Sequence, residues 1–303
     1  MQRVPLVYIL SNGRSGSTLL DLLLGAHPEA WSVGELQMLP FELDAPRDPC
    51  GCGAPVAECE FWRPFAERVS QAGPAPLHHF RERARHGRVL RPAQVLDALR
   101  GAPSGARRDQ AEAYGEHNEQ LLRAIHQAAE TRRGGAVRWL VDASKDPYRL
   151  AWLARSGRFD LRVIHLTKDP RAFVHSMTRD RERPGAARLL RFTGRWVVEN
   201  AIMRLVARRT VGAERVRAVR YEDLAGAPER TLAELGEWLD LEGLEATLET
   251  FREVENHAVG GNEMRWRAGR VRLDERWRSR LTAVERTFVA AASQPLRRAI
   301  GYR

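Results

Sequence analysis

The segment Ser11–Thr18 (SNGRSGST) has the residue types of an anion-binding loop. It follows an apolar run, Val4–Leu10, that is expected to form a buried strand, and it precedes Leu19–Gly25, which is expected to start a helix. A turn rich in glycine and serine at this junction directs several backbone N–H groups, and the positive end of the helix dipole, at one point. Such a turn can bind a phosphate or a similar anion.

The cation of this loop separates it from the loop of nucleotide triphosphatases. In the pattern G-x-x-x-x-G-K-[ST], a lysine after the second glycine reaches the outer phosphates, but Ser17 stands at that place here. The only cation is Arg14, on the other side of Gly16. An ordinary strand-to-helix turn is the alternative. The anion-binding residues expected in this loop are Arg14, Ser15, Gly16, Ser17 and Thr18.

A second turn of the same kind follows the β-rich run Leu161–Leu166. Asp169 and Pro170 are an N-cap and a first helical residue, so a helix is expected to begin there. Ser176 and Arg179 would then share one helix face, with Lys168 at its mouth. This pattern predicts a second anion site, and its alternative is an amphipathic helix with solvated arginines.

The two turns together resemble those of the sulfotransferases that use 3′-phosphoadenosine 5′-phosphosulfate (PAPS). The resemblance implies an α/β fold in which a P-loop-like parallel sheet is flanked by helices on both faces. It assigns Arg14–Thr18 to the 5′-phosphosulfate and Lys168, Ser176 and Arg179 to the 3′-phosphate. Two features depart from the family: Lys168 replaces the usual arginine, and Arg179 follows Ser176 by three residues rather than four. Arg171 or Arg181 could share the role of Arg179.

The same resemblance implies two catalytic residues besides Arg14. Glu35, in Val33–Leu36, matches a Gly-Glu step of tyrosylprotein sulfotransferases in which the glutamate is the base, and Lys145 matches the lysine of their Lys-Asp-Pro sequence. Sulfuryl transfer requires removal of the acceptor's proton and neutralisation of the charge that grows on the leaving oxygen. Glu35 would do the first, and Lys145 with Arg14 the second. A surface glutamate and a loop lysine are the plain alternatives.

Should Glu35 not be the base, three histidines are the next candidates, namely His27, His117 and His257, although His27 is expected simply to end the first helix.

Strand-like runs alternate with helical stretches along the chain, which indicates a parallel sheet covered by helices. The expected strands are Val4–Leu10, Trp139–Ala143, Leu161–Leu166 and Val216–Tyr221, and the expected helices include Ala111–Thr131, Ala187–Arg209 and Glu229–Leu239. We expect one domain over residues 1–303, with residues 40–110, including the arginine-rich Gly101–Arg108, as an insertion on the acceptor side. The stretch Asn256–Trp277 should also shape the acceptor pocket, and His257, Asn262 and Arg265 could close over the donor.

Charge and composition fit an anionic donor. The formal net charge is +10, from 49 Lys and Arg against 39 Asp and Glu. A basic chain could also bind nucleic acid, but the arginines are scattered and the sequence has no zinc finger, RNA-recognition aromatic motif or basic heptad array. No apolar run approaches the roughly 18 residues of a membrane span, and no cleavage site follows Val4–Leu10. We therefore expect a cytoplasmic protein without a nucleic-acid partner or a membrane span.

Three cysteines, Cys50, Cys52 and Cys59, lie close together in the sequence. Cys-x-Cys lacks the two-residue gap of zinc ribbons and fingers, and no histidine stands at ligand spacing. No metal is therefore expected, and a local loop closed by one disulfide under oxidising conditions is favoured, although the sequence leaves the choice between metal and disulfide open.

Two other function classes stay open beside the sulfotransferase. A P-loop kinase or other phosphotransferase would need a lysine in the first loop and a magnesium-binding carboxylate. A non-catalytic binder of nucleotides or sulfated glycans would keep the anion loops without a base. The sequence leaves the oligomeric state open, and also the acceptor, which could be a carbohydrate, a lipid headgroup, a tyrosine or a secondary metabolite.

Overall fold

Five parallel strands form one sheet in the computed structural model, which describes residues 2–44, 48–71, 95–97, 106–179, 185–266 and 269–302. The strands are β1 (Val4–Ser11), β2 (Ala30–Gly34), β3 (Trp139–Asp142), β4 (Phe159–Thr167) and β5 (Val216–Arg220), and they lie in the order β2-β3-β1-β4-β5. The predicted α/β class with a parallel sheet is confirmed. The four expected strands are present within one or two residues at each end, except that Tyr221 starts a helix.

Helices surround this sheet. The α-helices of the described residues are α1 (Ser17–Gly25), α2 (Leu39–Asp44), α3 (Ala66–Gln71), α6 (Ala106–Arg133), α7 (Pro147–Ser156), α8 (Pro170–Thr178), α9 (Ala186–Val211), α10 (Tyr221–Gly226), α11 (Pro228–Leu239), α12 (Thr247–Thr250), α13 (Trp277–Arg280), α14 (Ala283–Ala292) and α15 (Gln294–Ala299). Short 3-10 helices cover Leu36–Met38, Val56–Glu58, Arg63–Phe65, Ala213–Arg215, Leu244–Ala246 and Glu263–Trp266. None of the helices in the described part of the chain is long and apolar enough to cross a membrane.

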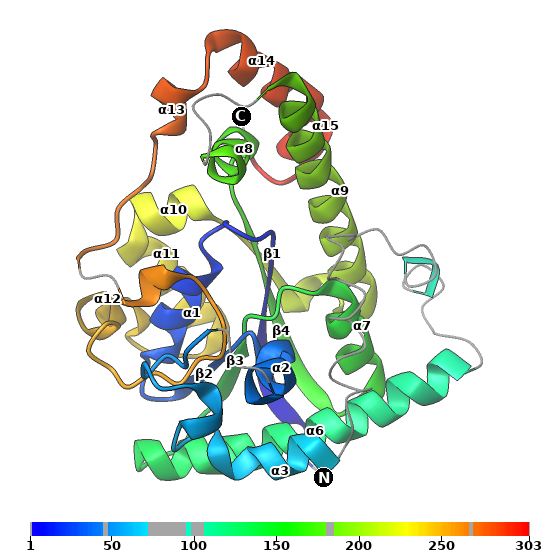
Figure 1. Ribbon diagram of the computed structural model, residues 1–303, viewed down its shortest axis with the longest axis vertical. Coiled ribbons are helices and arrows are strands. Elements are labelled where there is room, and N and C mark those ends of the chain that lie inside the picture. The colour runs from blue at the N-terminus through cyan, green and yellow to red at the C-terminus, as the bar shows by residue number, and fades with distance from the viewer. Residues whose placement is uncertain are drawn as a thin grey trace.

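The alternation of side chains along β1 builds two separate cores. Leu6, Tyr8 and Leu10 join the core of α6, α7 and α9, whereas Val7 and Ile9 join the core of α1 and α11. In Figure 1 the strands accordingly lie between α1 and α11 on the left and α7 and α9 on the right. Both faces of the sheet are therefore covered, as a parallel sheet requires.

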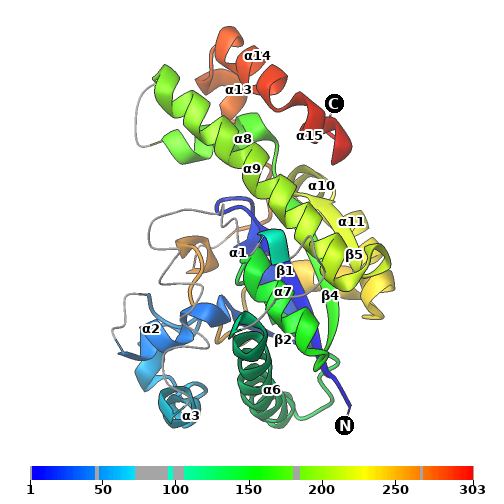
Figure 2. The same ribbon diagram turned by 90° about the vertical axis from the view of Figure 1, so that its right-hand side faces the viewer.

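The long helix α9 reaches beyond the sheet toward the C-terminal helices (Figure 2). Its first half packs with α8 and the C-terminal end of the chain through Phe173, Trp196, Val289 and Tyr302. The described residues between 40 and 105 form short helices and connecting segments and add no strand to the sheet, and residues 106–110 begin the long helix α6. Most of Gly101–Arg108 lies outside the described residues.

A buried ion pair fixes the turn between β3 and α7. Asp142 and Arg149 both have fully buried side chains, and Nη2 of Arg149 donates to Oδ2 of Asp142 over 2.8 Å. Arg149 also donates to the hydroxyl of Tyr114 and to Oδ1 of Asn118. Burial alone would lower the pKa of Arg149, but Tyr114 and Asp142 outweigh it and raise that pKa, so the guanidinium stays charged.

The residues between the two charges are held as well. Asp146 caps α7 by accepting from the backbone N–H groups of Tyr148 and Arg149, and Pro147 fills the first helical position. The hydroxyl of Tyr8 on β1 donates to the carbonyl of Asp146 over 2.8 Å. The turn is thus fixed at both ends and against the central strand.

Replacing Arg149 with methionine is expected to lower the free energy of unfolding by about 3–5 kcal/mol, because Asp142 would remain as an unpaired buried charge. Urea denaturation of the two proteins measures the change. Arg230→Met is the matched control, since Arg230 is 69% exposed and its ion pair with Glu234 is 3.9 Å long; it should change stability by less than about 0.5 kcal/mol. Equal effects of the two substitutions would contradict this account of the pair.

Candidate active site

All five parallel strands end at the same edge of the sheet. Each is followed by a residue or loop that could bind a ligand or take part in a reaction. Across the edge, in the order of the strands, these are Glu35 after β2, Lys145 after β3, the loop Ser11–Gly16 after β1, Lys168 after β4 and Tyr221 after β5. Open parallel sheets bind ligands at this edge, where the connections of neighbouring strands leave in opposite directions. Here that point lies between β1 and β4.

The loop after β1 forms the N-terminus of α1. Gly16 is the N-cap residue in the left-handed conformation (φ 90°), and its carbonyl accepts the first helical hydrogen bond, from Leu20. A Cβ atom on Gly16 would lie 2.5 Å from the ring of Tyr221, so only glycine fits. Ser15 is fully buried, and its hydroxyl has no hydrogen-bond partner among the described residues.

A network of polar side chains from α9 holds this loop from behind. Nδ2 of Asn12 donates to Glu199, and Oδ1 of Asn12 accepts from Asn200 over 2.6 Å. Asn200 also contacts the ring of His165 on β4, and Glu199 accepts from Arg195. Because these groups are buried and satisfied, they fix the path of the loop.

Glu35 and Lys145 meet side by side. Nζ of Lys145 lies 2.5 Å from Oε1 of Glu35, and both side chains are less than one-fifth exposed. The backbone of Lys145 is left-handed (φ 66°), and Arg14 shares this conformation (φ 71°). In the described residues only one other non-glycine residue, Asp240, has a positive φ. Such strain persists where the surrounding structure imposes it, and it gathers at functional sites.

The ion pair lies in a hollow between the start of α1 and a C-terminal loop. Ser17, Thr18, Glu35 and Lys145 line one side, and the loop Ala258–Gly261 lines the other. Val259 pairs with Gly34 as an isolated parallel bridge, which brings this loop against the end of β2. The hollow therefore places a carboxylate and an ammonium beside the anion loop.

The stretch that was expected to close over the donor borders this hollow in part. The backbone N–H of Asn262 donates to Oγ1 of Thr18, and Arg265 donates to the carbonyls of Ala258, Gly260 and Pro49. Arg265 thus holds the loop in shape. His257 is not among the residues that line the hollow, and its ring contacts Cys59 and Glu255.

Asp21 is a residue of the hollow that the sequence analysis missed. Its carboxylate is buried and accepts from the hydroxyl of Ser32 over 2.7 Å. Burial raises the pKa of Asp21 to about 7, although the bond from Ser32 and the charge of Lys145 oppose the shift. A signal was present in the sequence, because Asp21 is the one acidic residue in the leucine-rich run TLLDLLLG.

Positive charges gather around the loop after β1 and the turn after β4. Burial, and then the charge of Arg179, lower the pKa of Arg14. Lys168 is only 7% exposed, and its Nζ lies 4.1 Å from the centre of the Tyr221 ring. Burial lowers the pKa of Lys168, and Arg14 and Arg276 lower it further against Asp274 and Glu222. An anion bound among Arg14, Lys168 and Arg179 would relieve this mutual repulsion.

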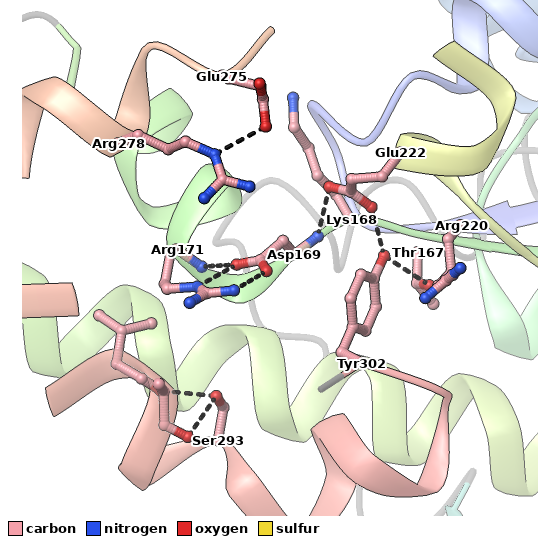
Figure 3. A network of polar contacts seen from close by, with 12 residues as sticks. Thr167, Lys168, Asp169, Arg171, Arg220, Glu222, Glu275, Arg278, Ser293 and Tyr302 are labelled. Atoms are coloured by element: carbon pink, nitrogen blue, oxygen red, sulfur yellow. Dashed lines mark hydrogen bonds and ion pairs between the residues drawn. The ribbon is translucent and has the colours of Figure 1, made fainter. Parts of the chain in front are cut away.

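The hydrogen bonds that hold the turn at Lys168 are made by neighbouring residues and do not involve its ammonium group (Figure 3). Glu222 accepts from the backbone N–H of Asp169 over 2.9 Å and from the hydroxyl of Tyr302 over 2.8 Å. Asp169 pairs with Arg171 and caps α8, as the sequence predicts. Figure 3 shows Lys168 extending away from this pair, and no salt bridge to Lys168 forms among the residues that the structure describes. Arg171 is engaged here by Asp169.

Other predicted residues are placed as follows. Ser176 lies half-buried on α8, and Arg179 is its exposed C-cap residue. Arg181 lies outside the described residues. His27 follows α1 and contacts the carbonyl of Glu242, in keeping with the end of a helix. His117 lies on α6 and does not line the hollow of Glu35 and Lys145.

The model of the Sulfotransferase family matches residues 57–246, which is more than half of the chain. The chain belongs to the sulfotransferase family. The turns that contain Lys145 and Lys168 lie inside the matched region, whereas Glu35 and the loop Ser11–Gly16 precede it. No curated protein sequence matches the chain.

Two solved structures show the same fold as this chain. The sulfotransferase domain from the olefin synthase of Synechococcus PCC 7002 is 23% identical, with a TM-score of 0.52 over 96% of this chain and 94% of that one. The sulfotransferase domain from the curacin biosynthetic pathway is 18% identical, with a TM-score of 0.53 over 100% of this chain and 99% of that one. The family and the fold together support sulfotransfer activity.

The raised pKa of Asp21 predicts a pH-dependent stability. The pKa of Asp21 is about 7 in the folded protein, against an ordinary value of 3.8. The free energy of unfolding therefore falls as the pH rises from about 4 to about 7, because the folded protein must give up a proton that the unfolded chain has already lost. Asp21→Asn keeps the acceptor for Ser32 and removes the titration. Its stability relative to wild type should therefore rise by about 2–3 kcal/mol between about pH 5 and pH 8.

Urea denaturation at the two pH values tests this. The control is Asp109→Asn on α6, where the side chain is exposed. A stability difference for Asp21→Asn that stays constant with pH, like that of the control, would show that Asp21 titrates normally.

Proposed function

We propose that the protein transfers a sulfuryl group from PAPS to a hydroxyl or amine acceptor. The observation that carries this proposal is the Glu35–Lys145 pair of 2.5 Å beside the anion loop that starts α1. It supplies a proton acceptor and a cation at one point, as in-line sulfuryl transfer requires.

In the proposed reaction the bond between sulfur and the bridging phosphate oxygen breaks, and a bond from the acceptor oxygen or nitrogen to sulfur forms. The acceptor's proton passes to the Glu35 carboxylate. Lys145 and Arg14 stabilise the charge left on the phosphate. Because a donor anion would compete with Glu35 for Lys145, donor binding would also release the carboxylate to act as a base. A positioned base contributes about 10² to 10⁴ in rate.

The nucleotide is proposed to lie along the carboxyl edge of the sheet. Its 5′-phosphosulfate would bind the loop Arg14–Thr18, where backbone N–H groups and the dipole of α1 favour an anion. Its 3′-phosphate would bind Lys168, Ser176 and Arg179. The like charges near Lys168 and Arg14 support this assignment. The reaction as proposed uses no metal ion.

Donor recognition predicts a preference for the 3′-phosphorylated nucleotide. Calorimetry should show 3′-phosphoadenosine 5′-phosphate binding at least about tenfold more tightly than AMP, because one added charge-assisted phosphate contact is worth about 1.5–3 kcal/mol. Lys168→Ala should remove most of this preference while leaving AMP affinity nearly unchanged. Equal affinities of the wild-type protein for the two nucleotides would remove the 3′-phosphate site from this account.

The base is tested by Glu35→Gln, which keeps the size and hydrogen bonding of the side chain but cannot accept the acceptor's proton. Turnover with labelled PAPS and a screened acceptor pool should fall about 10²-fold or more, with nucleotide affinity close to wild type. The matched control is Glu237→Gln, an exposed glutamate on α11, with unchanged turnover expected. Nucleotide binding without transfer to any acceptor would favour a binding protein instead. Transfer from ATP that requires Mg²⁺ would indicate a phosphotransferase.

A further inference from the structure

The three cysteines and His257 form a cluster that the proposed reaction does not use. Their four ligand atoms all lie within 4.8 Å of one another. Sγ of Cys52 is 3.8 Å from Sγ of Cys59, and Nδ1 of His257 is 3.2 Å from Cys59 and 3.8 Å from Cys50. The histidine comes from a segment 198 residues away from Cys59, so its approach is a consequence of the fold.

These three distances, 3.2–3.8 Å, are close to those of a tetrahedral zinc site. With Zn–S bonds of about 2.3 Å and Zn–N bonds of about 2.0 Å, two tetrahedral sulfur ligands stand about 3.8 Å apart, and a sulfur and a nitrogen about 3.5 Å apart. Cys₃His is one of the usual ligand sets of closed structural zinc sites. A disulfide between Cys52 and Cys59 would use two of the four groups and would leave Cys50 and His257 without a role.

We propose that Cys50, Cys52, Cys59 and His257 bind one structural zinc ion. The surroundings supply what such a site requires beyond its ligands. Nε2 of His257 contacts Oε1 of Glu255 over 2.8 Å, which is the carboxylate partner that orients zinc-binding histidines and leaves Nδ1 for the metal.

Backbone groups and aromatic rings complete the surroundings of the cluster. N–H groups of Phe61 and Trp62 donate to the sulfur of Cys59, and that of Cys52 donates to the sulfur of Cys50. The ring of Phe61 stacks on His257 with centroids 5.2 Å apart, and Nε1 of Trp62 donates to the His257 carbonyl over 2.6 Å. Donors to sulfur stabilise thiolates, and the rings exclude water from the metal.

The zinc would join residues 50–62 to the segment that borders the hollow of Glu35 and Lys145. Gly51 donates to the carbonyl of Ala258, and a Cβ atom on Gly51 would lie 2.2 Å from the side chain of Asn256. The residues directly after His257 are Ala258–Gly261, the loop that faces Glu35 and Lys145. A metal bond to His257 would therefore fix the C-terminal wall of the hollow to residues 50–62.

Metal analysis of the tag-free protein, purified under reducing conditions with zinc in the medium, tests the proposal. One zinc per chain is expected. Replacement by Co²⁺ should give the visible absorption of a tetrahedral cobalt–thiolate site. A zinc-free wild-type protein, with a Cys52–Cys59 disulfide found by mass spectrometry or with three freely reactive thiols, would overturn the proposal.

Variants separate the site from adventitious zinc. Cys52→Ser alters the exposed ligand, so folding should persist while zinc affinity, measured by competition with a chelating dye, falls at least about 10²-fold. Glu255→Gln should weaken zinc about 10–100-fold through the loss of the histidine's partner. Glu253→Gln, an exposed neighbour, is the control and should leave zinc affinity unchanged. Unchanged zinc affinity of Cys52→Ser would also contradict the proposal.

Discussion

The carboxylate of Asp142 is fully buried at the end of β3, where the Arg149 guanidinium balances its charge. A buried charge tolerates few alternative arrangements, because a displacement that separates it from its partner leaves it unpaired in the protein interior. The chain between the two residues must therefore keep one length and one path. Lys145 lies on that path in a left-handed backbone conformation, and its ammonium position depends on this pair.

The strand order divides the work along the sheet edge. β2 and β3 carry Glu35 and Lys145, β1 in the centre carries the anion loop, and β4 carries Lys168. Under the proposed function, the acceptor's proton is removed beside β2 and β3, and the 3′-phosphate of the nucleotide binds beside β4. The transferred group lies between them, at the loop after β1. Tyr221, the first residue of α10 after β5, links the two sides, because its ring lies against Gly16 and beneath Lys168.

Sequence patterns predicted the features that depend on neighbouring residues: four strands, the cap of α8, and the loop before α1. They missed β2, because Ala30–Gly34 is short and contains a polar side chain, Ser32, whose buried partner, Asp21, lies on another element. They also missed the raised pKa of Asp21, which arises from burial by distant segments. The meeting of His257 with the cysteines could not be predicted, because it joins residues nearly two hundred positions apart.

The chain contains 49 basic residues, of which only Lys145 and Lys168 are lysines, and both follow Ser or Thr and precede Asp-Pro. Arginine supplies every other basic side chain of this count, whereas the compact ammonium of lysine occurs only in two turns at the sheet edge. Apart from the α-amino group, primary amines therefore occur nowhere else on this molecule. Amine-directed chemistry, whether enzymatic acylation or a laboratory reagent, can modify no side chain of this protein outside its candidate active site.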